Sequence, residues 1–128
     1  MKDNVLLTIT SLLSILLFTF HLTDDIVRGF EKGGVSSLTA VPILVVWLYG
    51  TLVLGGRRSG YIILLIGSLL GLAVPLVHMM GKGVGGEIAR SSGAFFFIWT
   101  MIALGVTSLF SVILSVRGLW SLPWRRPR

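Results

Sequence analysis

Four long stretches without charged residues divide the chain. They cover residues 4–23, 33–56, 59–81 and 91–116, and they are 20, 24, 23 and 26 residues long. A helix rises about 1.5 Å per residue, so about 20 apolar residues cross the roughly 30 Å hydrocarbon core of a bilayer. Each stretch is long enough to do so. Four of them in succession predict an all-α integral membrane protein with four transmembrane helices.

The connectors between the stretches are short, so successive helices should run in opposite directions as an up-down-up-down bundle. We expect a single membrane domain over residues 1–128. The first helix should continue past the uncharged stretch, because Asp24 and Arg28 are spaced to pair along a helix, with a stop at Gly33 and Gly34. The expected helices cover residues 5–32, 36–55, 60–80 and 92–118.

Charge is distributed unevenly between the two ends of such a bundle. With four spans, both termini and the Arg57–Arg58 connector share one side, which carries seven basic residues and one acidic residue. The opposite side carries four of each, so the whole formal net charge of +6 lies on the first side. The positive-inside rule places that side in the cytoplasm. We therefore expect cytoplasmic termini and a multi-pass protein of the bacterial plasma (inner) membrane.

Composition supports a lipid environment. The chain is 54% hydrophobic and only 12% charged, and its mean hydropathy is +0.92. Soluble proteins have about 25% charged residues. The basic balance is explained by topology and by attraction to anionic lipid, so we expect the bilayer and no nucleic acid as a partner. The chain has no cysteine, which excludes disulfides and thiolate metal ligands.

Small residues recur at helical spacing in the third and fourth stretches. Such residues allow transmembrane helices to approach closely, so they should face other helices, whether within the bundle, in a homo-oligomer or in a membrane-protein partner. The expected packing residues are Gly67 and Gly71 in the third helix, and Ala103, Thr107, Ser111 and Ser115 in the fourth.

Both histidines of the chain, His21 and His78, lie near the outer end of an uncharged stretch. Acidic residues cluster at the same level, and His21, Asp24, Asp25 and Arg28 are spaced to share one face of the first helix. Neutral imidazole ligates transition metals and haem iron, with carboxylates as further ligands or as partners of the ligands. The candidate ligand pocket at this outer level comprises His21, Asp24, Asp25, Arg28, His78 and Glu87, with His21 and His78 as metal or haem ligands.

The sequence predicts no specific activity. No charged residue lies in the middle of a span, which argues against an ion-coupled carrier, and no catalytic motif is present. The leading hypothesis is a non-catalytic membrane partner or scaffold subunit with a ligand pocket at the outer ends of the first and third helices. One alternative is a haem- or metal-binding redox protein that uses both histidines. The other is an oligomeric transport or channel component. The histidines could also serve only as amphipathic residues at the lipid headgroups.

Overall fold

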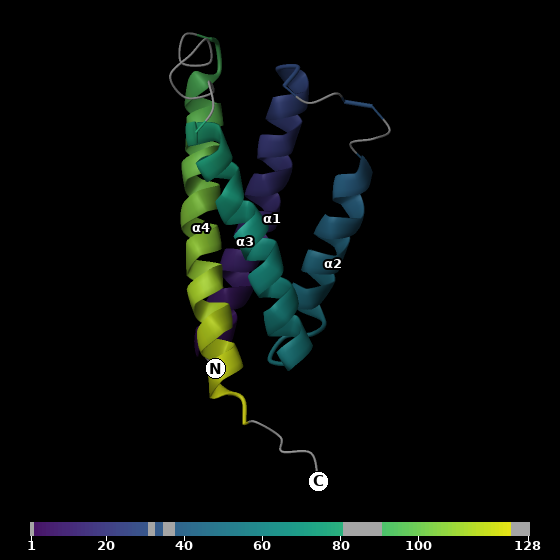
Figure 1. The fold of residues 1–128 in the computed structure, drawn as a ribbon, viewed down its shortest axis with the longest axis vertical. Coiled ribbons are helices and arrows are strands. Elements are labelled where there is room, and N and C mark those ends of the chain that lie inside the picture. Colours follow the sequence, from purple (N-terminus) through teal and green to yellow (C-terminus); the bar gives the residue numbers. More distant parts are fainter. Residues whose placement is uncertain (1, 31–32, 35–37, 81–90, 124–128) are drawn as a thin grey trace.

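The fold is all-helical throughout the part of the chain that the structure describes. This structure is a computed structural model, and it describes residues 2–30, 33–34, 38–80 and 91–123. The helices are α1 (Lys2–Val27), α2 (Ala40–Leu52), α3 (Arg58–Met80) and α4 (Ala94–Ser121) (Figure 1). Three of them, α1, α3 and α4, are long and apolar enough to cross a membrane. They indicate a multi-pass membrane protein in a lipid environment.

The four helices alternate in direction, and α4 packs along both α1 and α3 (Figure 1). The C-terminal ends of α1 and α3 lie at one end of the bundle, together with the start of α4. We call this the histidine end. At the opposite end α2 joins α3 through a tight turn, and these two helices diverge towards the histidine end (Figure 1). The side of α3 that faces α2 is therefore covered mainly near the turn.

The expectation that α1 extends to Lys32 is wrong, because the helix ends at Val27. Gly29 adopts a left-handed conformation with φ of +77°, which only glycine adopts without strain. The Gly29 N–H donates to the Ile26 carbonyl at 3.1 Å, and the Phe30 N–H donates to the Asp25 carbonyl at 2.9 Å. These two bonds form a Schellman motif, which satisfies carbonyls at a helix end. Gly29 therefore stops α1, four residues before the expected Gly33.

The second helix is also shorter than expected: α2 has 13 residues, Ala40–Leu52, instead of covering 36–55. Residues 35–37 lie outside the described part of the chain. At the other end the Val53 N–H caps the helix on the Tyr49 carbonyl at 2.9 Å, and Gly56 turns the chain with φ of +75°. A helix of 13 residues is about 20 Å long, shorter than the hydrocarbon core. By contrast, α3 and α4 begin and end within three residues of the expected bounds.

Hydroxyl groups join α1 to α4 in the interior. Ser14 Oγ donates to Thr107 Oγ1 at 3.0 Å, and Ser111 Oγ donates to Thr10 Oγ1 at 2.8 Å. Ser115 is fully buried further along the same stripe of α4, and Ala103 is half-buried. Small polar side chains thus allow α1 and α4 to approach closely, whereas larger apolar residues would hold the two helices apart.

Two glycines of α3, Gly67 and Gly71, lie beneath a tryptophan. A Cβ atom at Gly67 would meet the indole of Trp47, which is 2% exposed. A Cβ atom at Gly71 would meet Ser108 Oγ of α4 as well as the edge of the same indole. The indole Nε1–H donates to Ser11 Oγ of α1 at 2.9 Å. Trp47 therefore fixes α2 against both α1 and α3.

Candidate metal centre

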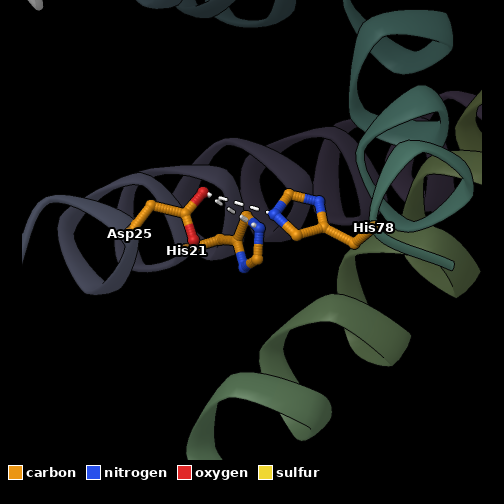
Figure 2. Close-up of side chains that lie close together, drawn as sticks. All are labelled: His21, Asp25 and His78. Atoms are coloured by element: carbon orange, nitrogen blue, oxygen red, sulfur yellow. Dashed lines mark ion pairs between the residues drawn. The ribbon is translucent and has the colours of Figure 1, made fainter. Parts of the chain in front are cut away.

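Three potential metal ligands meet at the histidine end, two from α1 and one from α3, which lies far away in the sequence. His21 and Asp25 lie one turn apart on α1, and His78 reaches them from the last turn of α3 (Figure 2). Asp25 Oδ2 is 3.5 Å from His21 Nε2 and 3.6 Å from His78 Nε2. One potential ligand atom from each residue lies within 4.8 Å of the other two.

Packing holds the two imidazoles in place. Their ring centroids are 4.8 Å apart, and the ring planes are inclined at 80°, an edge-to-face contact. Phe97 of α4 is fully buried beneath them, with its centroid 5.1 Å from the His21 ring and 5.5 Å from the His78 ring. Three of the four helices therefore fix the geometry of the cluster.

The backbone of α3 orients the ring of His78. His78 Nδ1 lies 2.9 Å from the carbonyl oxygen of Val74. Because a carbonyl can only accept, Nδ1 carries the hydrogen in this bond. In the neutral imidazole the lone pair is then on Nε2, the nitrogen that faces Asp25. Hydrogen bonding of the remote nitrogen to a carbonyl is the usual arrangement of a metal-binding histidine.

His21 is buried without a hydrogen bond to either ring nitrogen within the described residues. The residue is 3% exposed, and its Nε2 faces Asp25 Oδ2 at ion-pair distance but without hydrogen-bond geometry. Buried polar atoms are nearly always paired, because each unpaired group costs about 1–3 kcal/mol. The ring of His21 is therefore held in a position where a further partner would stabilise it.

The other residues of the expected pocket do not join this cluster. Arg28 Nε donates to Asp24 Oδ2 at 2.7 Å, and another guanidinium nitrogen donates to Ser91 Oγ at 2.8 Å. The guanidinium carbon also lies 5.6 Å from the centroid of Phe97. Arg28, held by Asp24, thus ties the end of α1 to the segment before α4. Glu87 lies outside the described residues.

A cavity of about 340 Å³ adjoins the cluster between α1, α2 and α3. His21, Asp25 and His78 form its polar end, and the rest of the wall is apolar. The indole nitrogen of Trp47 is already bonded to Ser11, so Trp47 offers the cavity only its hydrocarbon surface. The larger apolar side chains of the wall include Phe18, Leu22, Ile43, Leu44, Leu70 and Val77.

The arrangement suits a small cation bound by two imidazoles and one carboxylate. Ligand bonds of about 2.0–2.1 Å in a tetrahedral site place neighbouring donors about 3.3–3.4 Å apart. The two nitrogen–oxygen distances of 3.5 and 3.6 Å are close to that separation. Two histidines and a carboxylate form the ligand sets of zinc sites that keep a fourth position open, and of mononuclear iron(II) sites.

Sequence reasoning predicted a pocket at this end that includes His21, Asp25 and His78, but it did not predict that Phe97 forms the floor beneath the two imidazoles. Phe97 belongs to a run of three phenylalanines, and nothing in the run itself shows which one turns inward. Comparison of the chain with protein-family models, with curated proteins and with solved structures found no match.

Proposed function

We propose that this protein is an integral membrane protein that binds one divalent transition-metal ion through His21, Asp25 and His78. The observation that carries the proposal is the meeting of three ligand side chains from two helices around a buried, unbonded imidazole. An ion at their centre would give the buried ring of His21 a partner in an interior of low dielectric. The ligand set favours zinc, with iron(II) next.

A single ion fits this geometry better than haem does. A haem iron held by both histidines would place the porphyrin between their rings. Here the rings are in contact at 4.8 Å, and Asp25 Oδ2 lies within 3.6 Å of a nitrogen of each. An ion would draw together three ligand atoms that already lie within 4.8 Å of one another, whereas the macrocycle would have to separate the rings.

The partner-subunit and transport hypotheses receive less support from the site. Neither requires the two histidines of the chain to meet, whereas a metal centre does. A partner or scaffold role is compatible with metal binding, because an ion that joins α1 to α3 would rigidify the surface these helices present. We therefore propose a metal-binding, non-catalytic membrane protein.

We further propose four membrane spans with both termini in the cytoplasm, which places the metal centre near the outer surface. The short α2 would cross with the help of the apolar residues next to it or of local thinning of the bilayer. The support is the location of basic residues: the start of α1, the end of α4 and the Arg57–Arg58 turn lie at one end of the bundle. Arg117 pairs there with Asp3 at 3.3 Å.

Cysteine labelling tests this topology directly, because the natural chain has no cysteine. We expect an impermeant thiol reagent added to whole cells to label a Gly85→Cys variant and not a Ser59→Cys variant. Labelling of Ser59→Cys alone would invert the proposed orientation. Labelling of both would show that the two connectors share a side.

Metal analysis tests the proposed function. Protein purified in detergent and loaded with zinc should hold about one ion per chain by mass spectrometry and titration calorimetry. His21→Ala, Asp25→Ala and His78→Ala should each weaken zinc binding by more than the roughly 10–100-fold that follows loss of an outer hydrogen-bond partner. Asp24→Asn is the matched control, since this neighbouring acid pairs with Arg28 instead. Two results would refute the proposal. One is a full equivalent of bound zinc in a variant that lacks His21 and His78 together, and the other is the absence of zinc binding in the natural chain.

A further inference from the structure

The cavity beside the metal centre has the form of a binding site for one kind of molecule. We propose that it binds a lipophilic molecule with a single anionic oxygen group, a fatty carboxylate or the phenolate of a quinol, and that this oxygen takes the fourth position on the metal. This inference rests on the proposed metal site. It adds the chemical class of the ligand that the site would accept.

Polarity divides the cavity sharply. Among the described residues that line it, only His21, Asp25 and His78 are ionisable, and all three lie at the histidine end. The remainder, from Phe18 on α1 to Ile43 on α2, is hydrocarbon. A ligand in this space can satisfy a polar group only where it meets the proposed ion. Sugars, nucleotides and peptides would leave several polar groups unpaired against the apolar wall.

Charge selects the head of the ligand. A divalent ion bound by one carboxylate and two neutral imidazoles carries a net charge of +1 on the whole site. Burying net charge away from water is unfavourable, so a monoanionic donor in the fourth position would make the site neutral. The described residues that line the cavity include no lysine or arginine. Within this part of the chain, the metal is therefore the cationic partner that an anionic head would find.

The shape of the fold allows such a molecule to arrive from the bilayer. The cavity lies between α1, α2 and α3, where α2 and α3 diverge towards the histidine end (Figure 1). Ile43 of α2 and Val77 of α3 line the cavity and are also 49% and 66% exposed. The wall of the cavity is thus continuous with surface that faces lipid. The body of the ligand can stay in hydrocarbon while its head reaches the metal.

Cobalt(II) provides a spectroscopic test, since its visible absorption responds to a change of ligand. The natural chain is loaded with cobalt in a zwitterionic detergent and titrated with decanoate, 4-decylphenol, decylamine or acetate. Decanoate or 4-decylphenol should shift the absorption bands. The compound that does so at the lower concentration identifies the preferred head group. Decylamine should not shift them. Acetate has the same head as decanoate without the apolar body, so it should need a concentration at least about tenfold higher.

Two variants locate the body of the ligand. Ala73→Phe and Ile43→Trp each add volume inside the cavity, at positions that are already partly open. Either should raise the half-saturating decanoate concentration at least about tenfold. Leu76→Phe is the matched control, because Leu76 lies on the same helix, is 55% exposed and does not line the cavity. Cobalt absorption recorded before each titration shows separately whether the metal site is intact.

The two proposals fail in different ways. If the natural chain binds no cobalt or zinc, the proposed function is refuted and this inference falls with it. If cobalt binds but decanoate and 4-decylphenol leave its spectrum unchanged, the metal site stands and the inference is refuted. An equal response to acetate and decanoate, or to Leu76→Phe and both cavity variants, would also refute it. Those results would show an open coordination position without an apolar binding site.

Discussion

Gly71 provides the most direct test of how the helices are packed. It lies where α3 crosses α4, and a Cβ atom there would collide with Ser108 Oγ. The same atom would lie 3.3 Å from the Trp47 ring and 3.4 Å from Leu104 Cδ1. Gly71→Leu would add further carbons in this space. Since Trp47 and Leu104 are 2% and 0% exposed, neither can move without disturbing its own neighbours.

The magnitude follows from three contributions. Overpacking a close-packed interior costs about 1–3 kcal/mol. Displacing Ser108 would also break its 3.3 Å bond to Ser14 Oγ, and such bonds in membrane proteins contribute about 0.6 kcal/mol. Replacing a helical glycine by leucine gains about 0.8 kcal/mol in helix propensity. The last two nearly cancel, so Gly71→Leu should lower the free energy of unfolding by about 1–3 kcal/mol.

Denaturant titration of purified protein in mixed micelles, followed by the helical circular-dichroism signal, measures this loss. Gly55→Leu is the matched control, because a Cβ atom at Gly55 would meet only the carbonyl oxygen of Thr51, at 3.7 Å. The control should unfold at nearly the same denaturant concentration as the natural protein. A Gly71→Leu variant as stable as the natural chain would mean that Gly71 faces lipid or open space, and the packing argument would be wrong.

Three further predictions concern the histidine end. The effects of His21→Ala and His78→Ala on zinc affinity should be non-additive by about 0.5–3 kcal/mol, because residues that share a site couple. Additive losses of affinity in calorimetry would show that the two histidines do not share a site. Arg28→Ala removes the bonds to Asp24 and Ser91, so it should lower unfolding free energy by about 1–2 kcal/mol; unchanged thermal stability would contradict this. Zinc affinity should fall as the pH is lowered from 7.5 to 3.5, since ligands must be deprotonated to bind a metal; an affinity that stays constant over this range would exclude histidine and carboxylate ligands.

Much of this architecture could be predicted because lipid imposes simple rules on sequence. The lengths of the uncharged stretches predicted α1, α3 and α4. Because successive helices run in opposite directions, the same pattern predicted that both histidines lie at one end. Their meeting with Asp25 needed more than spacing. Asp24 and Asp25 are adjacent, and neighbouring side chains on a helix point about 100° apart. The i, i+4 spacing predicts the pairing of Asp24 with Arg28, but only the packing of α1 against its neighbours decides that Asp25 faces His78.

The burial of Phe97 and the end of α1 were not predicted, because neighbouring residues in the sequence look alike at both places. Phe95, Phe96 and Phe97 are equally apolar, yet they are 81%, 44% and 0% exposed. In water the buried one would stand out against polar neighbours, but a lipid-facing surface is as apolar as a core. The end of α1 was misplaced for a similar reason. Several glycines follow one another there, and the first of them to take the left-handed conformation ends the helix.

The ends of α1 and α3 also shape the electric field at the candidate site. Asp25 and His78 each lie two residues before the end of their helix, so both belong to a last turn. The carbonyl groups of a last turn leave a helix with about half a negative charge at that end. Two such ends converge on one cluster that already holds a carboxylate. The backbone therefore adds to the negative potential of the Asp25 carboxylate at the candidate site, and this potential favours a cation.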